Sequence, residues 1–179
     1  MAKVTVRTAE IDDAEAMGDA HVAAWQAAYR GIMPDGFLDA LDPAQRAAEW
    51  RTVIDRNPTP TEGRRLVVEL DGEVVGLALV WSCRDDGSAP ELGELILINL
   101  APPAWGTGAG TALLAECEAS LAACGYDEAV LWVATDNVRA RRFYEREGWH
   151  ADGAARTEDV DGAVVDETRY RKQLERPTS

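Results

Sequence analysis

Three glycines stand close together in the middle of the chain, with a spacing that suits phosphate binding. Gly106, Gly108 and Gly110 alternate with small residues in the stretch WGTGAGT. Ordering a glycine costs backbone entropy, so a cluster of glycines needs a physical reason. A helix N-terminus offers unpaired N–H groups and the positive end of a dipole, and residues without side chains let a phosphate approach them closely. The stretch therefore predicts a pyrophosphate-binding loop. The alternative is a tight turn that serves close helix–strand packing.

Two common phosphate-binding motifs do not fit this loop. A P-loop ends in Gly-Lys-Ser/Thr, whereas Gly110 is followed by Thr111 and Ala112. A dinucleotide fingerprint that begins at Gly106 requires glycine at position 111, where this chain has threonine. A nucleotide-dependent oxidoreductase is therefore disfavoured.

A second group of polar residues follows on a predicted short helix. Asn137, Ala140, Arg141 and Tyr144 lie three, four and seven positions from the first of them, so they share one helix face. An amide, a small residue, a cation and a phenol on one face suit the wall of a cofactor site. The alternative is that Tyr144 and its neighbour Phe143 are core aromatics.

Hydrophobic periodicity places both groups in an α/β domain. The glycines lie between a nearly continuous apolar strand at 92–100 and a helix predicted from Thr111 to Cys124. The order βααβββαβαββ predicts a single mixed β-sheet flanked by helices, built around one parallel βαβ unit. The other predicted elements are a strand from Val4, a helix opened by a capping box of Asp12 and Glu15 and ended near Gly31 and Pro34, a helix at 43–55 capped by Asp42, a hairpin that turns at Asp71-Gly72, a strand at 129–134, a helix at 138–147, and two final strands joined near Asp161-Gly162.

The composition limits the classes of protein to which the chain can belong. Its 179 residues predict one domain, at 1–174, with a short tail at 175–179. The net charge of −14 argues against a nucleic-acid binder and suits a cationic partner, although solubility is the simpler explanation. No apolar run approaches ~20 residues, so no membrane span is expected. The N-terminus lacks a signal core, and three cysteines cannot all pair, so we expect a cytoplasmic protein. Two histidines and no clustered cysteines predict no metal site.

Together, the two groups resemble the signatures of the GNAT (GCN5-related N-acetyltransferase) superfamily. The stretch APPAWGTGAGTALL resembles the acetyl-CoA signature, with Gly108 and Gly110 at its small positions and Trp105 where Gln or Arg is usual. The stretch DNVRARRFYEREGW is similar to the second signature, and AWQAAYRGIMPDGFLDALDP resembles the first helical region of bacterial members. The resemblance covers nearly the whole chain and implies the GNAT-like acyl-CoA transferase fold.

The resemblance also implies where acetyl-CoA, as co-substrate, is bound. The sheet is expected to splay between the strands at 92–100 and 129–134, and the pantetheine arm to enter that gap. The pyrophosphate is expected on the loop amides, while Trp105 cannot replace the usual long polar side chain. The implied cofactor-binding residues are Ile98, Asn99, Leu100, Gly106, Thr107, Gly108, Ala109, Gly110, Thr111, Asn137 and Arg141.

The chemistry implied is N-acetylation by direct attack of an amine on the thioester. Tyr144 is expected to donate a proton to the departing sulfur, and the Leu100 N–H to stabilise the oxyanion. Glu94 is the first candidate base, because strict alternation puts it on one strand face with Ile96 and Ile98. The alternative for Glu94 is an exposed charge at the entry of the strand, and His21 is a second candidate base.

The acceptor is expected to be a primary amine of a small molecule or peptide. Four aromatic residues could line its pocket, although each alone is more typical of a core: Trp25, Tyr29, Trp81 and Trp132. The resemblance leaves a homodimer open. The alternative function is a non-catalytic module that binds or senses acyl-CoA.

Overall fold

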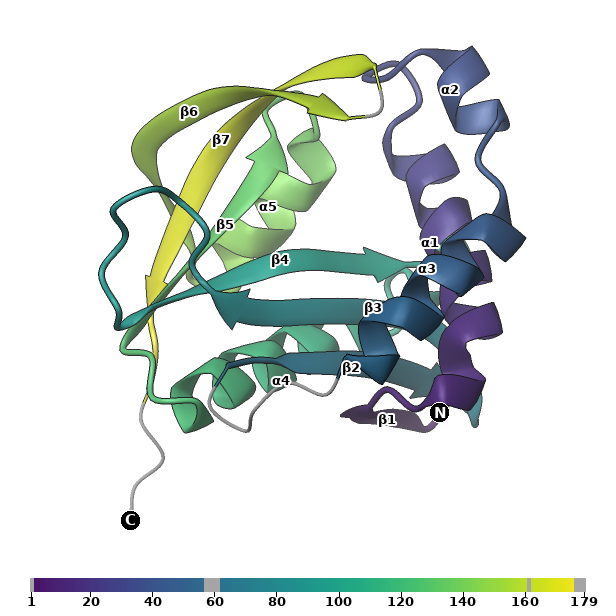
Figure 1. The fold of residues 1–179 in the computed structure, drawn as a ribbon, viewed down its shortest axis with the longest axis horizontal. Helices are drawn as coiled ribbons and strands as arrows, with labels where there is room; N and C mark the ends of the chain where they lie inside the picture. Colours follow the sequence, from purple (N-terminus) through teal and green to yellow (C-terminus); the bar gives the residue numbers. More distant parts are fainter. Residues whose placement is uncertain (1, 57–61, 161, 176–179) are drawn as a thin grey trace.

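The computed structural model describes residues 2–56, 62–160 and 162–175, and its centre is one mixed seven-stranded sheet (Figure 1). The strand order is β1-β2-β3-β4-β5-β7-β6. All neighbours are antiparallel except β4 and β5, which form the parallel pair expected from the βαβ unit. The strands are β1 (Val4–Thr8), β2 (Arg64–Leu70), β3 (Glu73–Ser82), β4 (Leu92–Leu100), β5 (Glu128–Ala134), β6 (His150–Val160) and β7 (Ala163–Gln173).

Helices cover both faces of the sheet. One face packs on α1 and α3 through a core that includes Met17, Trp50 and Leu77. The other face packs on α4 and α5 through a larger core that includes Leu113 and Tyr144. A third cluster joins Leu38 to Val165, which ties α2 to β7. The helices are α1 (Ala14–Ala28), α2 (Asp35–Asp39), α3 (Pro43–Asp55), α4 (Ala109–Ala123) and α5 (Val138–Arg146), with short 3₁₀ helices at Ile11–Asp13 and Pro102–Ala104.

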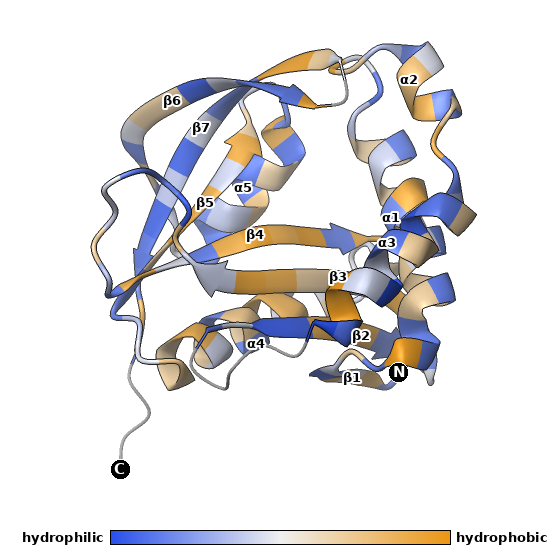
Figure 2. Ribbon diagram, viewed as in Figure 1, coloured by the Kyte–Doolittle hydropathy of each residue, from blue (hydrophilic) through white to orange (hydrophobic). Residues whose placement is uncertain are grey.

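Hydropathy follows these layers (Figure 2). The central strands β4 and β5 are largely apolar, whereas β6 alternates half-buried and exposed residues along its length. The two strands of the β6–β7 hairpin pair up to Val160 and Ala163. The predicted turn residue Asp161 and the predicted tail residues 176–179 lie outside the described residues. Within the described part of the chain, each helix is too short or too polar to cross a bilayer.

Several elements begin or end where local signals predict. Asp71 and Gly72 both have positive φ, at 54° and 90°, as a tight two-residue hairpin requires. Helix α3 starts at Pro43, and the Asp42 side chain accepts a hydrogen bond from the Ala44 N–H at 2.9 Å. The central strand β4 has the predicted bounds.

Three local predictions are wrong. The capping box is formed by Glu10 and Asp13 around the first 3₁₀ helix, and not by Asp12 and Glu15. The short helix α2 was not expected at all. Helix α4 begins at Ala109, two residues earlier than expected, because Gly108 adopts a φ of 92° and forms the N-cap.

Gly18 lets α1 and α3 pack closely. A Cβ atom at this position would lie 2.4 Å from the carbonyl oxygen of Pro43 and 2.8 Å from the backbone nitrogen of Ala47. Both neighbours are backbone atoms of α3, so they cannot move aside without moving the helix. This contact holds the two helices that carry Trp25 and Trp50 on the same face of the sheet.

The parallel strands β4 and β5 pair over only a short distance. Their register runs from Leu92 opposite Glu128 to Glu94 opposite Val130, and no later pair is formed although both strands continue. The two strands diverge beyond this point, as Figure 1 shows. The expected splay of the sheet is therefore confirmed.

A bulge in β4 changes which residues share a face. Opposite β3, Leu95 pairs with Val80 but Leu97 pairs with Leu79, so Ile96 is an extra residue. The expectation that Glu94 shares a face with Ile96 and Ile98 is wrong for this reason. Leu95 and Ile98 join the core under α4, whereas Leu97 packs on the α1 side. Glu94 is adjacent to Leu95, so it lies on the α1 side.

Candidate functional site

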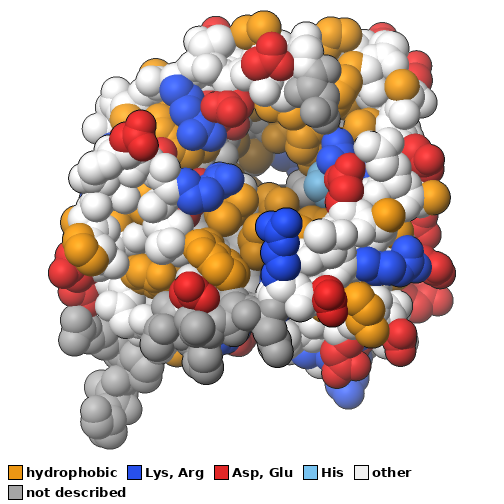
Figure 3. Space-filling model, in the orientation of Figure 1, with side chains coloured by type: hydrophobic (Ala, Val, Ile, Leu, Met, Phe, Trp, Pro, Cys, Tyr) orange, Lys and Arg blue, Asp and Glu red, His pale blue; other side chains and the backbone are white. Residues whose placement is uncertain are grey.

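A cavity of about 690 Å³ occupies the splayed part of the sheet. In the space-filling view the molecule is hollowed near its centre, with hydrophobic side chains inside the hollow and charged ones at its margin (Figure 3). Strand β4, the β4–α4 loop, helix α5 and the C-terminal end of α1 all contribute to its lining. Residues from both faces of the sheet line it, because β4 and β5 are no longer paired there.

The glycine loop forms one end of this cavity. Gly106, Gly108 and Gly110 all line it, together with Thr111. Helix α4 begins there, with the bond from the Ala112 N–H to the Gly108 carbonyl at 3.0 Å. The N–H groups of Gly110 and Thr111 precede that bond and have no acceptor within the helix. Two residues of this loop that were predicted to bind cofactor do not line the cavity: the Thr107 hydroxyl donates to the Ala104 carbonyl at 2.7 Å, and Ala109 is buried.

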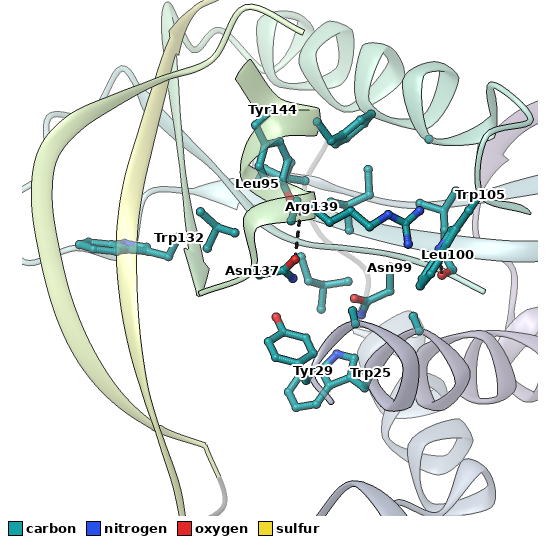
Figure 4. Close-up of a pocket in the computed structure, with 18 of the residues that line it drawn as sticks. Trp25, Tyr29, Leu95, Asn99, Leu100, Trp105, Trp132, Asn137, Arg139 and Tyr144 are labelled. Carbon is teal, nitrogen blue, oxygen red and sulfur yellow. Dashed lines mark hydrogen bonds between the residues drawn. The ribbon is translucent and has the colours of Figure 1, made fainter. Parts of the chain in front are cut away.

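Beside the loop, the side chains of Trp105 and Arg139 are stacked (Figure 4). The Arg139 guanidinium lies 3.2 Å from the centre of the Trp105 ring, and the Trp105 indole N–H donates to the Leu100 carbonyl at 2.9 Å. Among the described residues Arg139 has no carboxylate partner, and desolvation lowers its pKa. A partly desolvated cation without a counter-ion, next to unpaired amides, is suited to a phosphate. Sequence reasoning missed Arg139. The available signal was its spacing of seven residues from Arg146, which puts both arginines on one face of α5, and both line the cavity.

The last residues of β4 line the cavity as predicted. Ile98, Asn99 and Leu100 all contribute. The Asn99 side-chain nitrogen Nδ2 is buried and has no partner within the part of the chain that the structure describes. A buried amide donor without an acceptor is costly, so it marks a place where a bound molecule could offer one.

Two of the residues predicted on α5 have structural contacts. The Asn137 side chain accepts from the Ala140 N–H at 3.1 Å, so it caps the helix and also lines the cavity. Arg141 does not line the cavity: it donates to the Tyr170 hydroxyl at 3.1 Å and to the Thr135 carbonyl at 3.0 Å. The expectation that Arg141 faces the cofactor cavity is wrong, because these two acceptors hold it on the other side of the helix.

Tyr144 and Tyr29 approach the same part of the cavity from opposite sides (Figure 4). Tyr144 is buried against the rings of Trp149 and Tyr170, and this burial raises the pKa of its hydroxyl. Burial and the nearby carboxylate of Glu167 raise the pKa of Tyr29 to about 12. Both hydroxyls therefore stay protonated at neutral pH and are hydrogen-bond donors.

Glu94 lies outside the cavity lining and is fully engaged elsewhere. Its side chain is 2% exposed and accepts three hydrogen bonds from Arg84, whose backbone N–H, Nε and a terminal nitrogen lie at 2.9, 3.1 and 2.7 Å. The predicted alternative of an exposed charge is wrong, since the carboxylate is buried. This arrangement is that of an ion pair which fastens the 83–91 loop to β4.

His21, the second candidate base, is also outside the lining. Its Nδ1 accepts from the Trp50 indole at 3.2 Å, which leaves the proton on Nε2, and Nε2 has no partner among the described residues. Burial lowers the pKa of His21 to about 4, so the ring is neutral at pH 7. His21 also contacts the Trp25 ring, with ring centres 5.4 Å apart.

Three of the four aromatic residues predicted for an acceptor pocket line the cavity. They are Trp25, Tyr29 and Trp132. Trp81 does not, and its ring instead covers Gly63, where a Cβ atom would lie 2.4 Å from it. Sequence reasoning missed Glu167 on β7, which also lines the cavity. The period-two pattern of β7 puts Glu167 on one face with Val165, but only the fold brings this face to the cavity.

The chain is similar in sequence to known acetyltransferases. Residues 23–149 match the model of the acetyltransferase (GNAT) family. An uncharacterized N-acetyltransferase of Bacillus subtilis is 28% identical over 75% of this chain and 73% of its own length. An uncharacterized N-acetyltransferase of Mycobacterium tuberculosis is 30% identical over 86% of this chain and 83% of its own length.

Solved structures with the same fold include acetyltransferases. The PaiA N-acetyltransferase of Thermoplasma acidophilum in complex with coenzyme A superposes with a TM-score of 0.74. The alignment covers 96% of this chain and 99% of that one, at 20% sequence identity. At this identity the match supports the fold, and the predicted mixed sheet flanked by helices is confirmed.

Proposed function

The chain belongs to the acetyltransferase (GNAT) family, and from this premise we propose that it transfers the acetyl group of acetyl-CoA to a primary amine of a small molecule or peptide. The observation that carries the proposal is the cavity between β4 and β5, with the unpaired amides of the α4 N-terminus at one end. We propose further that residues 1–174 act as one domain in the cytoplasm. Cys83 and Cys117 are free thiols, which is compatible with that compartment.

The residues of the cavity fit acetyl-CoA. The amides of Gly110 and Thr111 and the guanidinium of Arg139 would hold its phosphates. The orphaned Nδ2 of Asn99 would donate to a carbonyl oxygen further along it. Arg139 thus supplies the positive group that Trp105, standing where Gln or Arg is usual in the family signature, cannot supply itself.

The reaction places simple demands on this chain. When bound, acetyl-CoA supplies an activated thioester, from which the amine nitrogen gains an acetyl group and the thiolate of CoA leaves. Tyr144 keeps its proton at neutral pH because burial raises the pKa of the hydroxyl, so it can donate a hydrogen bond to the departing sulfur. Most of the rate gain would come from holding the two reactants together in the cavity.

Two groups, a carboxylate and an imidazole, are candidates for the base that deprotonates the incoming amine. Glu94 is bonded to Arg84 and lies outside the cavity, and His21 has its Nδ1 engaged by Trp50. The arrangement supports release of the amine proton to water, with Glu94 holding the 83–91 loop on β4. Glu94 as the base itself is the competing assignment.

An assay of acetyl transfer tests the proposed function. The purified protein would be incubated with acetyl-CoA and phenethylamine, spermidine, glycine or a peptide with a free N-terminus, and the acetylated product measured by mass spectrometry. We expect product from at least one amine, and none without protein. If calorimetry detects acetyl-CoA binding but every amine stays unmodified, the protein is a non-catalytic acyl-CoA-binding module.

A further inference from the structure

The two ends of the cavity carry opposite charges. Arg139 and Arg146 of α5 line one end, beside the glycine loop. Glu167 of β7 is the only carboxylate among the described residues that line the cavity. The chain as a whole carries a net charge of −14, so this separation of charge is a local feature and does not follow from composition.

These charges also lie on opposite faces of the sheet. Helix α5 belongs to the face packed on α4, since Tyr144 shares a core with Leu113. Glu167 lies on the other face, because Val165, two residues before it, packs with Met33 and Leu38 on the α1–α2 side. The cavity therefore passes through the sheet where β4 and β5 separate. Its two mouths are suited to two different reactants.

Glu167 is held in place by an ion pair with Arg156. Its Oε2 accepts from the Arg156 Nε at 2.8 Å, and the side chain is 17% exposed. The Arg156 guanidinium also lies 4.3 Å from the centre of the Trp132 ring, so one cation fixes two residues of the cavity wall. The second oxygen, Oε1, has no hydrogen-bond partner in residues 2–56, 62–160 and 162–175, and is available to a ligand.

Aromatic residues line this end of the cavity. The rings of Trp25 and Tyr29 contact each other, with centres 5.1 Å apart, whereas Trp132 lies further along the wall with its ring pointing away from them (Figure 4). Aromatic faces bind apolar groups and attract cations. A carboxylate with one open oxygen beside such a wall is suited to an ammonium group attached to an apolar body.

We propose that Glu167 and the rings of Trp25 and Tyr29 form the acceptor subsite, and that the acceptor is a primary ammonium compound with an apolar or aromatic body and no carboxylate beside the amine. This inference rests on the proposed function and names its substrate class. The ammonium group binds Oε1 of Glu167, and a proton then leaves to water to give the neutral nucleophile. Glu167 thus determines specificity and orientation, and the proton transfer is not assigned to it.

A matched pair of amines tests the substrate class. Phenethylamine and phenylalanine differ only in the carboxylate beside the amine. We expect the KM of phenethylamine to be at least 10-fold lower than that of phenylalanine with the wild-type protein. An equal or lower KM for phenylalanine would overturn the proposal, since a second negative charge should be repelled by Glu167.

The substitution Glu167→Gln tests the residue. Loss of one charge-assisted hydrogen bond should raise the KM of phenethylamine by about 10- to 100-fold, with little change in kcat or in the affinity for acetyl-CoA. Glu158→Gln is the matched control, because Glu158 lies on the same hairpin and near the same Arg156 but outside the cavity. An unchanged KM in Glu167→Gln, or an equal change in Glu158→Gln, would exclude the assigned role.

A binding measurement separates this proposal from the proposed function. Calorimetry of phenethylamine with the CoA-loaded protein needs no turnover. Binding that Glu167→Gln weakens supports the subsite even if no amine is acetylated, in which case the proposed transfer alone fails. Turnover of phenethylamine that is insensitive to Glu167→Gln leaves the transfer intact and overturns the subsite. Absence of any binding to the CoA-loaded protein also overturns it.

Discussion

Glu94 shows how a single buried carboxylate can have either a chemical or a structural role. The carboxylate takes three hydrogen bonds from Arg84, although Arg84 itself is 56% exposed on its side chain. Solvent around the guanidinium weakens the Coulomb part of this pair. The hydrogen bonds to the buried carboxylate still stabilise the fold. A neutral side chain in place of Glu94 would leave the Arg84 donors with a poorer acceptor.

We expect Glu94→Gln to lower the free energy of unfolding by about 1–3 kcal/mol and to change kcat/KM by less than about threefold. Denaturant unfolding and kinetics from pH 6.5 to 9 would measure both. Arg84→Gln is the matched control and should give a similar loss of stability. A fall of about 10²-fold in kcat/KM, partly recovered at higher pH where more amine is neutral, would instead establish Glu94 as the base.

At the scale of elements, the N-terminus of α4 is the part of the site whose role can be tested most directly. Gly108 is a poor position for the test, because at a φ of 92° any β-branched residue is strained whether or not a ligand binds. Gly110 has ordinary helical geometry, and a Cβ atom there would lie 3.6 Å from the Phe143 ring, which is a normal contact. Substitution at Gly110 therefore separates ligand binding from folding.

We expect Gly110→Val to weaken acetyl-CoA binding by tenfold to a thousandfold, because its methyl groups would occupy the cavity between Leu100 and Phe143. Calorimetry would measure the affinity, and thermal unfolding of the free protein the stability. Gly36→Val on α2 is the control, since it has open space around it and lies outside the cavity. Normal affinity in Gly110→Val, or a collapse of stability without ligand, would mean that the loop is structural.

The elements that could be predicted from sequence are those specified by neighbouring residues. Asp71-Gly72 specifies its turn, Asp42-Pro43 starts α3, and the glycine spacing marks the loop before α4. The bulge at Ile96 could not be predicted, because an extra residue in β4 becomes visible only against the register of β3. The face assigned to Glu94 was wrong for that reason.

The candidate site was predictable to a similar extent. The loop glycines, the end of β4 and Tyr144 were found because family signatures and helix spacing act along the chain. Arg139 and Glu167 were missed, because their significance depends on the Trp105 ring and on Arg156, which only tertiary structure brings beside them. Arg141 was chosen on helix spacing, but its hydrogen bonds to the Tyr170 hydroxyl and the Thr135 carbonyl keep it out of the cavity lining.

At the scale of the whole molecule, the seven-stranded sheet has two parts joined by a short stretch of pairing between β4 and β5, which we call the seam. One part consists of β1, β2, β3 and β4 and the other of β5, β7 and β6, and the seam is the parallel pairing of residues 92–94 with 128–130. Beyond Glu94, strand β4 keeps its pairing with β3 up to Leu100 on one edge only. Its other edge faces the cavity, where backbone groups lack a strand partner.

Because of this one-sided pairing, we expect the backbone amides of residues 95–100 to fall into two sets with different hydrogen–deuterium exchange rates. Amides that point to β3 should exchange slowly with or without ligand, whereas those that point to the cavity should exchange rapidly in the free protein. Saturating acetyl-CoA should slow the second set by about 10- to 100-fold, as a ligand that completes the missing ladder would. Residue-resolved NMR would measure the rates, and equal rates along the whole of β4 in the free protein would contradict this expectation. A strand with this pattern reports directly whether the cavity is occupied, so the same spectra would rank acyl-CoA analogues without any assay of turnover.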